Sequence, residues 1–255
     1  LSFTAAPDSA TNFDGNTHTG GVTITGGELR ITGDSRSSSY QIDSGAIMNC
    51  DIASGTAQAD TTTYTGTGTL RKSGSGELQW NRVTASAGTF SMGAGGLIDV
   101  QAGVMAPGYG SNENFTNNLA DLHIESGATF RNVNSGVRVN KLTGAGQLES
   151  GWHTGTVNFV VGVDNGTSTF DGTLHDSGLG SSLGKLTLVK VGTGTLTLTN
   201  SSTYTGDLNV RAGTVTVTTT GSISGIRRLD VSGTDSATLN IEGAVTTGGS
   251  SVFRL

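Results

Sequence analysis

The chain has 255 residues, of which 41 are glycine and only 2 are proline, while charged residues make up 13% and aromatic residues 5%. The formal net charge of −6 speaks against nucleic acid or an anionic membrane surface as a partner. No apolar run reaches the roughly 18 residues that a membrane-spanning helix needs, and no stretch has the apolar spacing and caps of a long soluble helix.

The composition indicates an all-β protein. Thr, Val and Ile suit the pleated surface of a strand, and Gly and Ser supply turns. The hydrophobic fraction of 33% is low for a compact domain. A solenoid accounts for this, because each coil contributes only a few side chains to a narrow shared core.

An internal repeat runs along the chain. Two apolar residues alternate with polar ones, a turn containing glycine follows, and a second alternating pair comes next. In chain order the unit recurs at 22–31, 42–47, 98–104, 122–130, 208–217 and 229–241. Period-two alternation places one side of each short strand inside, so the unit predicts two strands that meet at a corner.

Two shorter motifs also repeat, and both contain glycine. Gly-x-Gly-x-Leu occurs at 66–70, 74–78, 144–148 and 192–196, and Thr-Tyr-Thr-Gly occurs at 63–66 and 203–206. Glycine reaches corner dihedral angles that branched residues cannot adopt. We therefore expect the first motif to form corners, and Tyr64 and Tyr204 to have a structural role there.

The repeat spacing sets the expected architecture. Val100 to Ile124 spans 24 residues and Val210 to Val231 spans 21, which is close to one coil of a β-helix. We expect a right-handed parallel β-helix (solenoid) of about 10 to 12 coils and roughly 50 to 60 Å in length. No linker divides the chain, so one domain over residues 1–255 is predicted.

Three local features have a structural interpretation. Cys50 shares strand parity with Met48 and Ile52, which predicts a buried, inert thiol. The basic pairs Arg71-Lys72 and Arg227-Arg228 are interpreted as solvated strand edges.

Residues 185–217 closely resemble the autotransporter-associated β-strand repeat. That family has a K-x-G-x-G-T-L-x-L stretch that leads through Asn and Tyr-x-Gly to an alternating strand and a Gly turn. The corresponding residues are Lys190, Gly192, Gly194, Leu196, Leu198, Asn200, Tyr204, Gly206, Val210 and Gly213. A weaker echo at 63–80 has the elements in another order.

The resemblance implies a secreted or surface-exposed bacterial protein and implies no chemistry. Leu1 to Thr4 contains neither a start methionine nor a signal peptide, so we expect an excised module or a processed product with flanking domains of the same polypeptide. We also expect a monomer. Fold-level comparison extends to polysaccharide lyases, pectin-type glycosidases and carbohydrate-binding modules, which guides function only weakly.

Catalytic patterns are absent from the sequence. No two acids are adjacent, there is no Gly-His-Gly, and neither H-E-x-x-H nor G-x-S-x-G occurs. Asp164, Asp171 and Asp176 with Lys185 form the best acid grouping, and scattered solvated acids explain them better. The histidines, which show no metal spacing, are His18, His123, His153 and His175.

These patterns predict a protein that is not an enzyme and has no cofactor. One Ca²⁺ candidate remains in Asn12 to Asn16, where a plain turn is the favoured interpretation because the alternating acids of a calcium loop are missing.

Aromatic side chains supply the candidate binding residues, because sugar rings stack on flat faces. Trp152 and His153 lie in the expected loop 151–155, and Tyr109 lies in the expected loop 107–118; a third loop is expected at 175–184. Trp80 completes the candidate set, although its parity with Leu78 favours the core. Phe130, Phe159 and Phe170 are expected in the core.

Two functions from different classes remain open. The first is a non-catalytic carbohydrate-binding module of a secreted enzyme, which recognises a neutral plant cell-wall polysaccharide such as xylan or a β-glucan. The alternative is a structural or adhesive passenger or stalk segment of a bacterial surface protein. A polysaccharide lyase or glycosidase comes third.

Overall fold

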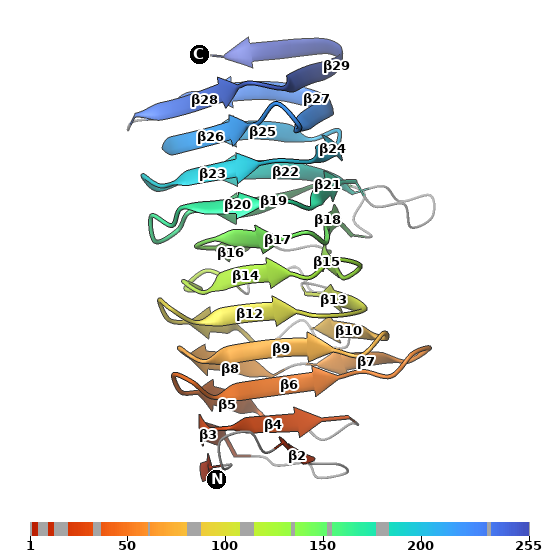
Figure 1. Cartoon of the computed structure of the whole chain (residues 1–255), viewed down its shortest axis with the longest axis vertical. Helices are drawn as coiled ribbons and strands as arrows, with labels where there is room; N and C mark the ends of the chain where they lie inside the picture. The colour runs from red at the N-terminus through yellow and green to blue at the C-terminus, as the bar shows by residue number, and fades with distance from the viewer. Residues whose placement is uncertain are drawn as a thin grey trace.

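The structure, a computed structural model, describes residues 2–4, 10–12, 20–32, 37–60, 62–80, 88–107, 115–133, 136–151, 155–176, 184–233 and 236–254. Short strands stack along one long axis, with the N terminus at one end and the C terminus at the other (Figure 1). Each strand pairs in parallel with strands about one turn away in the chain. The protein is an all-β parallel β-solenoid with three faces.

The first face starts as a five-stranded sheet and continues as one arm of a 13-stranded sheet. Residues 115–120 join the two parts, because Leu119 N–H donates to the Met92 carbonyl and Asn140 N–H donates to the Ala120 carbonyl. The strands of this face are β1 (Ser2–Thr4), β3 (Val22–Gly26), β5 (Ser39–Ile42), β8 (Thr63–Gly66), β11 (Phe90–Met92), β16 (Val137–Val139), β19 (Thr156–Val161), β22 (Lys185–Lys190) and β25 (Asp207–Val210).

The second face is an unbroken 11-stranded parallel sheet. Its strands are β2 (Ala10–Asn12), β4 (Glu28–Ile31), β6 (Ile47–Asp51), β9 (Thr69–Ser73), β12 (Leu97–Val100), β14 (Asp121–Ile124), β17 (Leu142–Gly144), β20 (Ser168–Phe170), β23 (Thr195–Leu198), β26 (Gly213–Val217) and β28 (Ala237–Ile241).

The third face is the other arm of the 13-stranded sheet. Its strands are β7 (Ala57–Asp60), β10 (Glu77–Trp80), β13 (Val104–Ala106), β15 (Thr129–Asn132), β18 (Gln147–Ser150), β21 (Thr173–His175) and β24 (Ser201–Thr203). Two long strands, β27 (Ser222–Val231) and β29 (Ala244–Arg254), bend around the corner between the third and first faces. Gly225, with a φ of 85°, lies at the bend in β27.

The described strands make about eight complete turns. A strand occupies all three faces in the turns that contain β5–β6–β7, β8–β9–β10, β11–β12–β13, β16–β17–β18, β19–β20–β21, β22–β23–β24, β25–β26–β27 and β27–β28–β29. The repeat length varies more than the sequence spacing suggested. In-register partners on the second face lie 19 residues apart from Leu29 to Met48 and 28 apart from Leu70 to Ile98.

Strand alternation produces the core as the repeat predicted. On β23, Leu196 and Leu198 are buried while the threonines between and beside them are not. Register then aligns inward residues of successive turns into columns. One column on the second face consists of Ile31, Cys50, Lys72, Val100, Ile124, Gly144, Phe170, Leu198, Val217 and Ile241.

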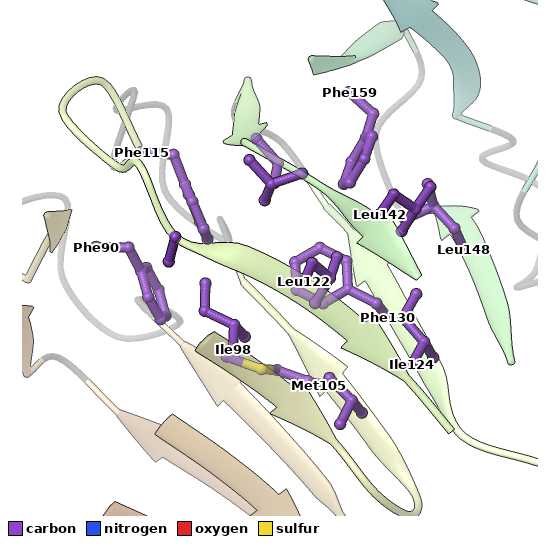
Figure 2. Close-up of a cluster of buried hydrophobic side chains, with 14 of the residues drawn as sticks. Phe90, Ile98, Met105, Phe115, Leu122, Ile124, Phe130, Leu142, Leu148 and Phe159 are labelled. Carbon is purple, nitrogen blue, oxygen red and sulfur yellow. The ribbon is translucent and has the colours of Figure 1, made fainter. Parts of the chain in front are cut away.

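Aromatic rings form a continuous ladder inside the N-terminal half. Ring centroids are 5.9 Å apart between Tyr40 and Tyr64, 5.5 Å between Tyr64 and Phe90, and 4.4 Å between Phe90 and Phe115. Trp80 lies 4.4 Å from Phe90. Figure 2 shows how Phe90 and Phe115 face each other beside the aliphatic columns. Tyr40, Tyr64 and Phe90 lie on β5, β8 and β11 of the first face, and Phe115 extends the ladder into the segment that joins the two parts of that face.

Several sequence predictions about the interior are confirmed. Cys50 is a free, buried cysteine, and Tyr64 and Tyr204 are buried. All four Gly-x-Gly-x-Leu motifs lie between two strands, and the first glycine of each has a positive φ. The three phenylalanines predicted for the core, Phe130, Phe159 and Phe170, are fully buried.

Two predictions were wrong in part. Arg71-Lys72 is not a solvated pair, because alternation on β9 turns Arg71 outward and places Lys72 in the interior column, where it is fully buried. The expected projecting loop 107–118 returns to the core at its end, since Phe115 and Asn118 are fully buried. Within the described residues, no helix is long and apolar enough to cross a membrane.

Truncating the centre of the aromatic ladder tests its contribution. Phe90→Ala should lower the free energy of unfolding in urea by about 3 to 5 kcal/mol, because a large buried ring leaves a cavity beside three other rings. Ile241→Ala is the control, since Ile241 is 48% exposed, and its cost should be below about 1 kcal/mol. Equal losses in the two variants would show that the ladder adds nothing.

Candidate functional site

Of the four candidate ligand-binding residues, the structure describes only Trp80. Trp80 is fully buried, and its indole N–H donates to the Thr62 carbonyl over 2.9 Å. It presents no face to a sugar ring, so its place in the candidate set is corrected in favour of the core. Tyr109, Trp152 and His153 lie outside the described residues.

The described surface offers no aromatic platform. The aromatic side chains whose exposure the structure describes are all buried; they are Tyr40, Tyr64, Trp80, Phe90, Phe115, Phe130, Phe159, Phe170 and Tyr204. Among the side chains with a described exposure, the exposed large apolar one is Ile241. A sugar-binding surface built on stacking therefore has no support from these faces.

A buried lysine forms the most distinctive polar site. Lys72 Nζ donates to the carbonyl oxygens of Ser73 at 2.7 Å, Gly74 at 2.8 Å and Ala102 at 3.0 Å. The first two acceptors lie at the corner after β9, and the third lies one turn further along the solenoid. One ammonium group thus ties two successive turns together, an arrangement that we call the lysine clamp.

The same clamp recurs at Lys190. Its Nζ donates to the carbonyls of Val191 at 2.6 Å and Gly192 at 2.9 Å, and to Ala212 of the next turn at 3.4 Å. The acceptors have the same sequence offsets at their corner and the same Ala-Gly context on the next turn. The signal was present in the sequence as Lys-x-Gly-x-Gly at 72–76 and 190–194, followed by Ala-Gly at 102–103 and 212–213. The first copy lies within the weak echo at 63–80.

Glycine allows the two turns of the clamp to approach closely. A Cβ on Gly213, which has a φ of 63°, would lie 2.4 Å from the Gly194 carbonyl oxygen and 2.5 Å from that of Gly192. A Cβ on Gly103 would lie 2.3 Å from the Gly76 oxygen and 2.7 Å from the Gly74 oxygen. The near-identical contacts define one structural unit that is used twice.

Burial affects the charge of both clamp lysines. Desolvation lowers the pKa of Lys190 to about 8. It also lowers the pKa of Lys72 to about 8, against the opposing influence of Cys50 and Asp51. Tyr204 is fully buried, and desolvation, with Asp176 and Asp207 nearby, raises the pKa of its hydroxyl far above the ordinary value.

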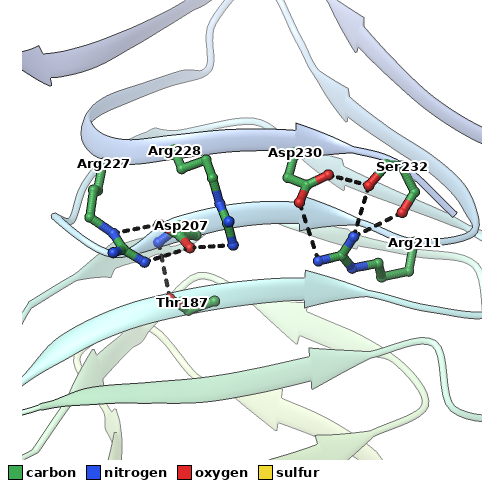
Figure 3. A network of polar contacts seen from close by, with 7 residues as sticks. All are labelled: Thr187, Asp207, Arg211, Arg227, Arg228, Asp230 and Ser232. Carbon is green, nitrogen blue, oxygen red and sulfur yellow. Dashed lines mark hydrogen bonds and ion pairs between the residues drawn. The ribbon is translucent and has the colours of Figure 1, made fainter. Parts of the chain in front are cut away.

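A second polar site lies outside the core on the first face, near the C-terminal end (Figure 3). Asp207 accepts from Nε and Nη2 of Arg227, each at 2.9 Å, and lies 3.0 Å from Nη2 of Arg228. One turn further, Asp230 lies 3.3 Å from Arg211 and accepts from Ser232. The serine hydrogen bond, followed by the nearby arginines, lowers the pKa of Asp230.

The acids that could have formed a catalytic group instead link turns. Asp171 accepts from the Thr199 hydroxyl at 2.6 Å. Asp176 accepts from Leu186 N–H at 2.8 Å and from both the backbone and the hydroxyl of Thr205. Among the described residues, no group of three or more His, Cys, Asp and Glu side chains is placed to hold a metal ion. The Ca²⁺ candidate at 12–16 falls almost entirely outside those residues.

The fold and these sites define a parallel β-solenoid whose turns are joined by repeated internal clamps. The family model described as Passenger-associated-transport-repeat matches residues 13–31 and 188–217. The second match begins on β22 and contains the Lys190 clamp with Gly213. These two segments are therefore similar to a repeat that occurs in autotransporter passengers.

No curated protein and no solved structure matches the chain.

A glycine pair tests the close approach of turns at the clamp. Gly213→Ala should destabilise the protein by more than about 3 kcal/mol, because both backbone strain and a carbonyl clash must be relieved. Gly127→Ala is the matched control: its φ is 83°, but its Cβ would meet nothing within 4 Å, so only about 1 to 2 kcal/mol of strain is expected. Similar losses by urea denaturation would contradict the clamp geometry.

The lowered pKa of Lys190 predicts a pH-dependent stability. The unfolded lysine keeps its proton up to about pH 10.5, whereas the folded one loses it from about pH 8. The unfolded state then binds more protons, so this lysine makes the free energy of unfolding rise between pH 8 and pH 10.5. A rise of about 1 to 3 kcal/mol is expected, from about 1.4 kcal/mol per pKa unit.

Lys190→Met should reduce the rise measured by urea denaturation at each pH and leave the part that Lys72, with its pKa also lowered to about 8, contributes. Lys185→Met, at the exposed opposite end of β22, should keep the rise. Parallel pH profiles for wild type and Lys190→Met would contradict the effect of burial.

Proposed function

We propose that this chain is a structural segment of the passenger of a bacterial surface protein, a rigid solenoid that holds other parts of that protein away from the cell. The repetition of one lysine clamp at Lys72 and Lys190 carries the proposal. Each clamp uses a buried charge to join consecutive turns and leaves no chemistry open to solvent, which suits a scaffold.

The family match supports the same function, because residues 188–217 match the passenger-associated repeat over the second clamp. Parallel pairing supports rigidity: each turn bonds its backbone to the turns above and below, and stability grows as a sum over neighbouring turns.

Carbohydrate binding on a neutral plant cell-wall polymer has weaker support. The candidate platform Trp80 lies in the core, and nothing in the comparisons points to xylan or a β-glucan. A non-catalytic role is part of the proposal, because Asp171 and Asp176 are engaged in bonds between turns. Flanking domains of the same polypeptide and a monomeric state are also proposed.

Right-handed winding and 10 to 12 coils belong to the proposal as well. Crossovers between parallel strands are right-handed in about 98% of cases. The 11 strands of the second face, each in a different turn, support the coil number.

Distances between spin labels test the rigid scaffold. In a Cys50→Ala background, labels at Ser44 and Asp164 sit on the corner between the first two faces, five turns apart. Labels at Ser44 and Thr193 sit six turns apart. Pulsed electron resonance should give narrow distributions whose maxima differ by about 5 Å, the spacing of stacked strands. Broad or unchanged distributions would overturn the rigid-spacer function.

A further inference from the structure

One cluster of charged side chains on the C-terminal turns contains more arginines than carboxylates. Two guanidinium groups flank Asp207, and Asp230 lies beside Arg211 and in register with Arg254. The described residues of the cluster therefore place four arginines against two carboxylates, a net charge of +2, whereas the whole chain has −6. We name the set Arg211, Arg227, Arg228 and Arg254 the arginine strip.

Buried carboxylates orient the guanidinium groups of the strip. Asp207 is 3% exposed and holds Arg227 through two parallel hydrogen bonds, while the Arg227 side chain itself is 61% exposed. The Nη1 N–H groups of Arg227 have no partner among the described residues. An exposed guanidinium oriented by a buried acid is prepared for a second anionic group, because little side-chain freedom is lost on binding.

Two further polar atoms, one in the strip and one beside it, lack hydrogen-bond partners in the described structure. These are Nε of Arg228, a donor, and Oδ1 of Asn209, an acceptor on a residue only 7% exposed. Asn209 lies in register with Asp230, between the two arginine pairs. The strip thus has spare donors suited to a carboxylate and one spare acceptor suited to a hydroxyl. If the guanidinium groups moved toward a bound ligand, Nε of Arg228 and Oδ1 of Asn209 would become accessible to that ligand.

We propose that the arginine strip binds an acidic polysaccharide. A sugar acid offers a carboxylate and hydroxyl groups within one residue, which matches the spare donors and the spare acceptor. Nucleic acid fits less well, because duplex DNA carries about one charge per 1.7 Å and the acidic chain repels so dense a charge more strongly than one carboxylate per sugar residue. A membrane fits less well, because the large apolar side chain that is exposed among the described residues, Ile241, lies on the second face and away from the strip.

Native affinity electrophoresis of the whole 255-residue chain tests the proposal, with polygalacturonate in the gel as the probe. Wild type should be retarded by polygalacturonate at low salt and not by neutral xylan. Arg227→Gln with Arg228→Gln should weaken retardation by roughly tenfold or more, because two charge-assisted contacts are lost. Arg227→Lys should fall between, since it keeps the charge and loses the fork geometry.

Arg71→Gln is the matched control. Arg71 is 30% exposed and paired with Asp99, but it lies on the second face, so retardation should stay at the wild-type level. Because the double variant leaves buried Asp207 without its arginines, a triple variant that adds Asp207→Asn keeps the test valid if the double variant unfolds. Circular dichroism follows the fold in each.

Three results would overturn the proposal. The first is no retardation of wild type, and the second is equal retardation of Arg71→Gln and the double variant. The third is equal or stronger binding to poly-glutamate, duplex DNA or anionic vesicles, which would assign the strip to another partner. None of these results changes the spin-label distances, so failure here is separable from failure of the scaffold function.

Discussion

Parallel hydrogen bonding between successive turns is the constraint on which the rest of this structure depends. Each backbone segment of a solenoid must pair with the turn above and the turn below, since an unpaired buried polar group is costly. Turns of 19 to 28 residues keep this register because the extra residues are accommodated between strands. Inward residues then align in columns, and each column repeats one position of the sequence unit.

The lysine clamps follow from the same constraint. At the corners that follow Lys72 and Lys190, carbonyl oxygens of two successive turns point toward the buried ammonium group of the lysine. Lys72 and Lys190 each supply donors to three of them across two turns. Desolvation opposes the charge and the hydrogen bonds favour it, so a residue type usually found on surfaces occupies a core column. Glycine at 103 and 213 completes the geometry, because any side chain there would separate the turns.

The outer surface follows a different principle. Outward positions carry threonine, serine and short ion pairs that link neighbouring turns, as at Asp171 with Thr199 and Asp207 with Arg227. Through these contacts the outward acids join one turn to the next. The arginine strip differs because its positive charge exceeds the local negative charge, which leaves donors free on a face that is otherwise satisfied. A scaffold and a local binding surface are compatible on one solenoid, since each face is built by separate side chains.

The amino-acid sequence alone was enough to predict the all-β class, the parallel solenoid, the corners and most of the core, because period-two alternation and the glycine motifs are local signals. It also located the repeat at 185–217. The burial of Lys72 followed only from the folded structure, because its charge is typical of a surface position. The parity of Trp80 with Leu78 favoured the core, and the packing confirms that position although the aromatic ring also suited a binding surface. The hydrogen-bond partners of Lys72 and Arg227 also followed only from the folded structure. These partners lie about one turn away, and because the turn length varies, the sequence does not predict which residues are in register.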